Sequence, residues 1–286
     1  MTDRASGLRW PKAVGLSAAY LVGGLLLTGL LVYGASYAIG PAVLSADAAG
    51  SLLLQGVLEL AAFAFLTWLI GRRLLRMGWD ELRVRVPGAG RGFVGGLVLA
   101  TGLALLALVV AVPAAGARWS PDAGGVGAYV QSVVGVLAVL APAALAEEVI
   151  FRGLPVVLLA RVFGRGPAIV ALAVVFGLVH GANPSVTPLA IGNIALAGVF
   201  LGLAFFAPGG LWTAWGAHLG WNATIAAADA PVSGLPFTIP LIDYDPGAPA
   251  WLSGGAFGPE GGVLATVVLL LGCFLLGQQL RKDEPA

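Results

Sequence analysis

The side chains best suited to proton chemistry in this chain of 286 residues stand in strongly apolar sequence. Its two histidines, His180 and His218, lie in apolar stretches, and the segment EEVIFR at 147–152 places two glutamates and an arginine in another. An ionisable side chain at the centre of a membrane helix costs about 2.5 to 3.5 kcal/mol on insertion scales and normally faces a polar cavity. These residues therefore indicate chemistry inside a membrane.

Composition agrees with this setting. Hydrophobic residues make up 59% of the chain and charged residues 10%, with a mean hydropathy of +0.95, whereas roughly a quarter of the residues of a soluble domain are charged. The chain is thus expected to be an integral membrane protein. A net charge of +1 without a continuous basic stripe argues against nucleic-acid binding. The single cysteine, Cys273, excludes an intrachain disulfide and a cysteine metal cluster.

The apolar runs predict an all-α polytopic fold with eight transmembrane helices in one domain, residues 1–286. A helix needs about 20 mostly apolar residues to cross a bilayer. The first run follows basic residues, as in a signal peptide, but it is too long for that and is taken as the first span. The predicted spans are 13–38, 52–70, 93–115, 127–162, 167–182, 187–207, 210–228 and 262–280.

Basic residues predict the orientation, because lysine and arginine near span ends are retained in the cytoplasm. With both termini cytoplasmic, only Arg118 falls outside, and acidic residues of the loop 229–261, namely Asp229, Asp243, Asp245 and Glu260, lie on the outer side. The basic residues are nearly all arginine, beside abundant alanine and glycine, which is typical of GC-rich bacterial genomes. The expected location is therefore a bacterial inner membrane. The loop 229–261 is interpreted as a connector, with a lid that dips back as the alternative.

Helical spacing separates the roles of the two glutamates. Glu148 and Arg152 are four residues apart and share a helix face, so we expect a structural ion pair. Glu147 points about 100° away from its neighbour on the helical wheel. It remains free to face another partner and is the better candidate for a general base.

A turn fixes the depth of the first histidine. The segment FGRGP at 163–167 breaks the helix midway between Glu147 and His180, so an antiparallel pair of helices brings these two side chains to similar depth. Phe176, four residues before His180, is expected to pack on the same face. His218 and Asn222 are also four apart and project together from the seventh predicted span.

These groups have two chemical interpretations. A glutamate and a histidine that share a water can act as a general base, while a second histidine and an asparagine amide can donate hydrogen bonds to an oxyanion. The set Glu147, His180 and His218 could instead bind a divalent metal such as zinc. The chain lacks an H-E-x-x-H zinc signature, which favours the metal-free mechanism.

Two further polar residues lie within predicted spans. Glu59 has Gln55 one turn earlier on the same face. It is interpreted as a partner in a hydrogen bond between helices, with a place in the cavity wall as the alternative. Asn193 is expected to hydrogen-bond between helices and not to bind a ligand.

The motifs EEVIFR (147–152), FGLVH (176–180) and HLGWN (218–222) resemble the EExxxR, FxxxH and HxxxN motifs of the CPBP intramembrane endopeptidases. This group contains CAAX proteases and bacteriocin-processing proteins and is also called the ABI family. Each motif is weak alone, but their order and helical placement are specific, and together they mark a catalytic core at about 130–228. Family members have been described both as metalloproteases and as metal-free glutamate peptidases.

The resemblance implies an endopeptidase that cuts near the C terminus of membrane-associated peptides. It also implies roles for individual residues: Glu147 and His180 would activate water, His218 and Asn222 would stabilise the oxyanion, and Glu148 and Arg152 would support the site. The substrate stays open between a prenylated CAAX tail, a bacteriocin-like leader and a membrane-protein tail.

Two other function classes use the same buried polar residues. A membrane carrier could relay protons or bind a metal ion with them, although the sequence has no obvious inverted repeat. A noncatalytic scaffold or immunity protein could sequester membrane partners. Only the peptidase requires Glu147 for peptide cleavage.

Overall fold

The computed structural model describes residues 8–41 and 49–283. Seven helical segments in these residues are long and apolar enough to cross a membrane, which confirms the all-α polytopic prediction. They are α1 (Trp10–Ile39), α2 (Ala49–Leu66) with the π-helical turn η2 (Thr67–Leu74), α3 (Ala89–Ala115), α4 (Val126–Arg152) with α5 (Leu154–Phe163), α6 (Arg165–Val179) with the turn η3 (His180–Ala182), α7 (Pro188–Phe206) and α10 (Val263–Asp283).

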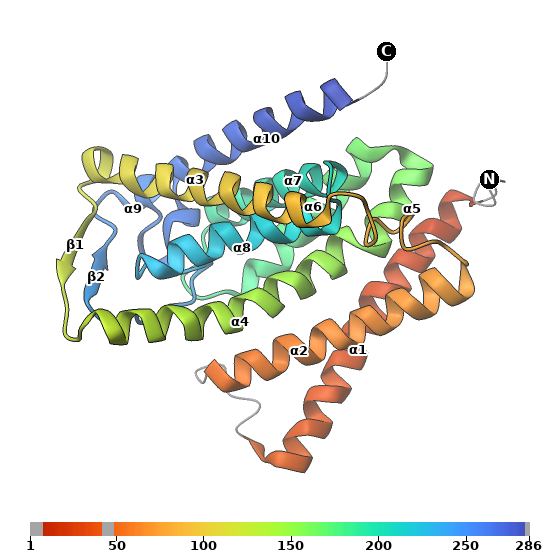
Figure 1. Ribbon diagram of the computed structural model, residues 1–286, viewed down its shortest axis with the longest axis horizontal. Coiled ribbons are helices and arrows are strands. Elements are labelled where there is room, and N and C mark those ends of the chain that lie inside the picture. Colours follow the sequence, from red (N-terminus) through yellow and green to blue (C-terminus); the bar gives the residue numbers. More distant parts are fainter. Residues whose placement is uncertain (1–7, 42–48, 284–286) are drawn as a thin grey trace.

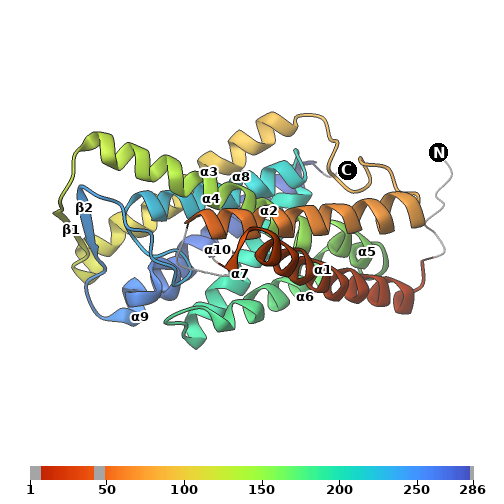
Figure 2. The same ribbon diagram turned by 90° about the horizontal axis from the view of Figure 1, so that it is seen from below.

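The remaining predicted span, 210–228, forms the shorter helix α8 (Leu211–Ala227), which has 17 residues. It lies inside the bundle against α3, α4 and α7, whereas α1 and α2 cover the side formed by α4 and α5 (Figures 1 and 2). Most of its side chains are buried. The helix that carries His218 and Asn222 is therefore surrounded by protein and not by lipid.

The predicted span 127–162 is two helices, because the chain breaks at Gly153. Pro155 has no N–H, and its ring crowds the carbonyl four residues earlier, which disfavours a continuous helix. A side chain at position 153 would overlap the carbonyl of Val149, so the sharp bend requires glycine. Helix α5 consequently leaves α4 in a new direction (Figure 1).

His180 lies within the predicted span 167–182, which the structure places at Arg165–Ala182, but it lies just beyond the end of the α-helix in that span. Helix α6 ends at Val179, and His180 begins the 3₁₀ turn η3 (His180–Ala182). Gly181 lowers helix stability, and Pro184 disfavours helical geometry at Asn183. The imidazole therefore stands where α6 gives way to the connection to α7.

The outer segment, residues 229–261, is folded. Strand β1 (Arg118–Pro121) pairs antiparallel with β2 (Ile242–Asp245), although the sequence analysis predicted no strands. Short helical turns follow: α9 (Ala250–Ser253), η4 (Gly255–Phe257) and η5 (Pro259–Gly261). Arg118, the basic residue predicted to lie outside, forms an ion pair with Asp245 across this ribbon.

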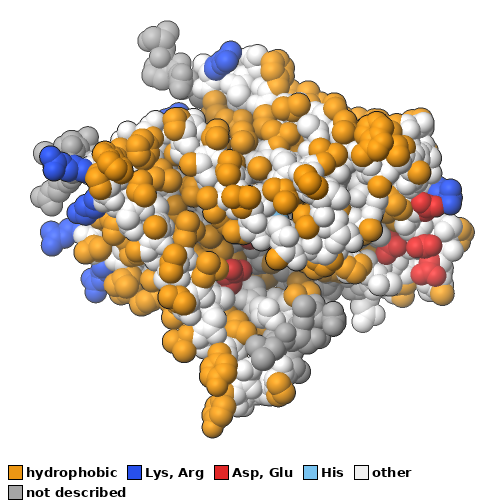
Figure 3. Space-filling view, turned by 180° about the vertical axis from the view of Figure 1, so that it is seen from behind, with side chains coloured by type: hydrophobic (Ala, Val, Ile, Leu, Met, Phe, Trp, Pro, Cys, Tyr) orange, Lys and Arg blue, Asp and Glu red, His pale blue; other side chains and the backbone are white. Residues whose placement is uncertain are grey.

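Charge is distributed unequally along the molecule. Lysine and arginine gather at one end of its surface and most of the aspartate and glutamate at the other, with apolar side chains between them (Figure 3). Helix α1 begins and α10 ends at the end opposite to the β ribbon (Figure 1). The distribution matches a helical bundle that crosses a bilayer with its basic end on one side.

The close contact between α3 and α8 yields the first prediction. A methyl group on Gly96 would overlap the backbone carbonyl of Thr213, whereas one on Gly102, in the same helix, would meet no atom within 4 Å. Gly96→Ala should lower the free energy of unfolding by about 1 to 3 kcal/mol through overpacking. Gly102→Ala should be neutral or slightly stabilising, because alanine favours helix. Denaturant unfolding in detergent measures both, and equal effects would contradict this packing.

Candidate active site

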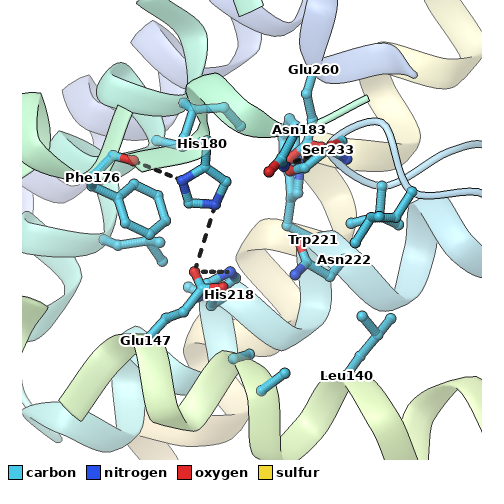
Figure 4. Close-up of a pocket in the computed structure, with 18 of the residues that line it drawn as sticks. Leu140, Glu147, Phe176, His180, Asn183, His218, Trp221, Asn222, Ser233 and Glu260 are labelled. Atoms are coloured by element: carbon cyan, nitrogen blue, oxygen red, sulfur yellow. Dashed lines mark hydrogen bonds and ion pairs between the residues drawn. The ribbon is translucent and has the colours of Figure 1, made fainter. Parts of the chain in front are cut away.

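A cavity of about 210 Å³ lies between α4, α6, α7, α8 and α10 and is closed on one side by the outer segment (Figure 4). Most of its wall is apolar, with leucine, phenylalanine, isoleucine and alanine side chains. Its polar lining consists of Glu147, His180, Asn183, His218, Trp221, Asn222, Ser233 and Glu260. The structure thus brings three sequence motifs, far apart in the chain, to one cavity.

Glu147 faces both histidines. Its Oε2 atom is 4.0 Å from Nε2 of His180 and 3.8 Å from Nε2 of His218 (Figure 4). Both separations exceed a direct hydrogen bond of about 2.7 to 3.2 Å, and polar groups at such separations are commonly bridged by water. The Glu147 side chain as a whole is 30% exposed, whereas its Oε2 atom is buried and has no hydrogen-bond partner among the described residues. Glu148 beside it is fully buried.

The other nitrogen of each imidazole is occupied. Nδ1 of His180 lies 2.7 Å from the carbonyl oxygen of Phe176. Because a carbonyl only accepts hydrogen bonds, Nδ1 carries the hydrogen, and Nε2 of the neutral ring presents a lone pair. Nδ1 of His218 likewise lies 2.8 Å from Oε1 of Glu148 and donates to that carboxylate. Both Nε2 atoms therefore point their lone pairs toward Glu147 when the rings are neutral.

This geometry has an electrostatic consequence. The Glu147 carboxylate and two neutral Nε2 atoms are three acceptors around one small space, and a single water has only two hydrogens to donate. The arrangement is satisfied when one of the three groups carries an additional proton, or when a cation is bound. A carboxylate beside two imidazoles is the kind of arrangement that general acid–base catalysis uses.

The predicted ion pair of Glu148 and Arg152 is present and nearly inaccessible to solvent. Nη1 of Arg152 donates to Oε1 of Glu148 at 3.0 Å, and their side chains are 3% and 0% exposed. The same oxygen accepts the hydrogen bond from His218. This second contact joins α4 to α8, and helical spacing within one segment could not predict it.

Phe176 fills the space between these groups. Its ring centre is 4.6 Å from that of His180, as the spacing predicted, and 6.2 Å from that of His218. The guanidinium of Arg152 lies over the same ring at 4.4 Å from its centre. The phenylalanine therefore holds both imidazoles and the arginine in fixed relation.

Asn222 lies on the cavity wall one turn after His218, across the cavity from Glu147 (Figure 4). Its side-chain amide makes no hydrogen bond within the described residues. An amide in a cavity without a protein partner is available to a ligand.

Several residues of the cavity were not found by sequence analysis. The sequence analysis assigned Glu260 only to the outer loop 229–261, whereas the structure shows that it is 5% exposed and lines the cavity, as do Ser233, Leu235 and Phe237. The interpretation of the outer segment as a mere connector was therefore incomplete. Its apolar run LPFTIPLI was the one signal in the sequence for a segment that covers the site.

Asn193 and Glu59, the other two polar residues of the predicted spans, lie in different surroundings. Asn193 joins α7 to the start of α10, since its Nδ2 donates to the carbonyls of Glu260 at 2.8 Å and Gly262 at 2.9 Å. Its Oδ1 accepts from Thr266 at 2.6 Å, which confirms the predicted interhelical role. Glu59 is half-buried on α2 and is not among the residues that line this cavity.

The donor types at the site suit a metal ion, but their spacing does not. Within residues 8–41 and 49–283, no group of three or more His, Cys, Asp and Glu side chains is arranged to hold a metal. Glu147, His180 and His218 contribute one oxygen and two nitrogens, which are zinc donors. They would have to close around the ion to bind it.

Comparison with known proteins identifies the segment that forms the site. Residues 129–224 match the family model of type II CAAX prenyl endopeptidases, Rce1-like. No curated protein and no solved structure matches the chain. The matched segment covers about a third of the chain and contains all three motifs together with Glu147, His180, His218 and Asn222. Over this segment the chain is similar to the CAAX-type membrane endopeptidases, which supports the resemblance to the CPBP family drawn from the three motifs.

Proposed function

We propose that this protein hydrolyses a peptide bond of a membrane-associated substrate with a water molecule activated by Glu147 and His180. The observation that carries the proposal is the convergence of Glu147 Oε2 with Nε2 of both histidines, at 3.8 and 4.0 Å, inside an enclosed cavity. The match to the endopeptidase family supports the class of reaction.

The residues suggest how the water is used. Glu147 accepts one proton of the water, and the lone pair of His180 Nε2 orients its other hydrogen. The water oxygen then forms a bond to the carbonyl carbon of the substrate while its proton passes to Glu147. Glu147 subsequently delivers that proton to the leaving nitrogen as the carbon–nitrogen bond breaks, so the carboxylate is regenerated.

The developing oxyanion needs donors, which Asn222 and His218 supply. The amide of Asn222 donates directly. Since Nδ1–H of His218 is committed to Glu148, its Nε2 can donate only when the ring is doubly protonated. The Glu148 carboxylate lies against that ring and compensates its charge. We therefore assign to His218 the additional proton that would satisfy the three acceptors, which are the Glu147 carboxylate and Nε2 of each histidine.

A resident metal is the alternative use of these residues. Zinc would polarise the substrate carbonyl and lower the pKa of a bound water. The spacing of Glu147, His180 and His218 and the lack of an H-E-x-x-H signature favour the metal-free mechanism.

The charge distribution and the position of the cavity suggest how the protein lies in the membrane and what kind of peptide it cleaves. The basic end of the molecule is the end where α1 begins and α10 ends (Figures 1 and 3). We propose that this end faces the cytoplasm at a bacterial inner membrane, because basic residues near span ends are retained on the cytoplasmic side. A cavity among spanning helices suits a peptide that is anchored in the bilayer, either through a prenyl group on a CAAX tail or through its own apolar segment. A cleavage screen with both kinds of peptide separates these substrates.

Glu147→Gln is expected to abolish cleavage, because glutamine keeps the shape of the side chain but cannot accept the proton. General-base catalysis typically contributes about 10² to 10⁴ in rate. The measurement is cleavage of a farnesylated CAAX peptide and of its unmodified form by the full-length protein in detergent, with product identified by mass spectrometry.

Glu81→Gln is the matched control, since Glu81 pairs with Arg161 of α5 and neither residue lines the cavity. It should cleave like the wild type. Wild-type activity in Glu147→Gln would exclude Glu147 as the base, and a carrier or scaffold would show no cleavage in any variant.

Asn222→Asp should lower kcat by about 10² to 10³, the usual cost of losing one oxyanion donor. The aspartate has the same shape but carries no donor and repels the developing charge. Because the interaction forms only in the transition state, KM should change little. A raised KM with unchanged kcat would instead assign Asn222 to binding of the substrate.

Removal of metal should leave cleavage unchanged if Glu147 acts without a metal ion. The test is activity after dialysis against a zinc chelator, combined with elemental analysis of the purified protein. Loss of activity that returns with added zinc, together with one zinc per chain, would replace the metal-free mechanism.

A further inference from the structure

Glu260 is a buried carboxylate on the far side of the cavity from Glu147, outside the matched segment 129–224 (Figure 4). It is 5% exposed and lies in the turn η5 before α10. Its backbone carbonyl accepts the hydrogen bond from Asn193, which fixes its position relative to α7. A buried charge of this kind requires compensation by donors.

Three donors supply that compensation. Oε1 accepts from the indole Nε1 of Trp221 at 3.1 Å. Oε2 accepts from the hydroxyl of Ser233 at 2.8 Å and also from the backbone N–H of Ser233. Donors approach both oxygens and no acceptor is bound to either, so the ionised carboxylate satisfies the set and a neutral amide does not. We call Glu260, Trp221 and Ser233 the Glu260 clasp.

The clasp connects the elements that carry two of the reacting groups. Trp221 precedes Asn222 directly in α8. Ser233 accepts through its carbonyl from Nδ2 of Asn183 at 2.8 Å, and Asn183 immediately follows the turn η3 that begins with His180. Glu147 on α4 has no such link to the clasp. Glu260 is thus the point where α8, the His180 turn and the outer segment meet.

We propose that Glu260 is a positioning residue for peptide hydrolysis, which through Trp221 and Ser233 holds Asn222, the His180 turn and the cavity roof in register with Glu147. The roof consists of Val232, Ser233, Leu235 and Phe237. The inference rests on the proposed peptidase function. It adds a residue outside the three motifs to the machinery of that site.

The test uses the full-length protein in detergent and the farnesylated CAAX peptide. In Glu260→Gln, whichever way the amide turns, its NH₂ group faces a donor, either Trp221 or Ser233. Loss of one hydrogen bond to a buried charge corresponds to about tenfold or more in an equilibrium or rate. We expect kcat/KM to fall about tenfold at a temperature well below unfolding, whereas Glu81→Gln retains the wild-type value.

A double-mutant cycle distinguishes positioning from general destabilisation. Trp221→Phe removes the indole donor, so the NH₂ of glutamine can face that side without a clash. Trp221→Phe should therefore lower kcat/KM less when it is introduced into Glu260→Gln than when it is introduced into the wild type. It could even restore part of the activity that Glu260→Gln has lost. Strictly additive effects of the two changes, or wild-type kcat/KM in folded Glu260→Gln, would overturn the proposal.

If Glu260→Gln does not fold, Ser233→Ala provides a second test, because it removes only the hydroxyl donor. It should lower kcat/KM by a smaller factor, and an unchanged kcat/KM would also overturn the proposal.

Hydrogen exchange separates failure of this inference from failure of the proposed function. The amide hydrogens of residues 229–237 should exchange faster in Glu260→Gln than in the wild type, whether or not the peptide is cleaved. If exchange is faster but neither the wild type nor any variant cleaves the peptide, the proposed peptidase function is wrong, and Glu260 cannot have a positioning role in catalysis. The hydrogen bonds of the Glu260 clasp would still be supported by that result. Unchanged exchange would refute the clasp even in an active peptidase.

Discussion

The shared carboxylate of Glu148 is the interaction on which the site depends. One oxygen accepts from Arg152 on its own helix and from His218 on α8, at 3.0 and 2.8 Å, and all three side chains are almost completely removed from solvent. Removing one member of a buried ion pair typically costs about 3 to 5 kcal/mol, because the other charge is left without a partner. The contact therefore fixes the tautomer of His218 and the relation of α4 to α8 at once.

Packing makes this contact possible. Helix α8 is too short to be a typical span, yet it occupies the interior of the bundle, where α3 approaches it closely at Gly96. In a membrane, close approach of backbones and hydrogen bonds between helices replace the hydrophobic drive that assembles soluble bundles. Trp215 on α8 donates to the carbonyl of Ala141 on α4 at 2.9 Å. The reacting groups of α4 and α8 are thus held by backbone contacts on both sides of the helix that carries His218.

The sequence predicted the features that depend on residues close together in the chain, such as helices and contacts one helical turn apart. Most spans, the Glu148–Arg152 pair and the contact of Phe176 with His180 follow from hydrophobic runs and four-residue spacing. Pro155 indicated a kink in the span 127–162, but the full break at Gly153 and the end of α6 before His180 were not predicted, because a proline or glycine near a helix end leaves hydropathy unchanged. The place of Glu260 was missed for a different reason. Its partners Trp221 and Ser233 are 39 and 27 residues away, and no periodic pattern connects them.

The two carboxylates on opposite sides of the cavity show why the outer segment belongs to the site. Glu147 is partly exposed to the cavity and meets lone pairs, so its surroundings suit a group that exchanges protons. Burial raises the pKa of the Glu260 carboxyl, and the hydrogen bonds from Ser233 and Trp221 partly offset this rise. Its three donors suit a structural role. A cavity closed by flexible chain could not maintain this division. The segment between α8 and α10 is instead joined to the His180 turn, α7 and α8 through Asn183, Asn193 and Trp221, and it forms the wall of the cavity opposite Glu147.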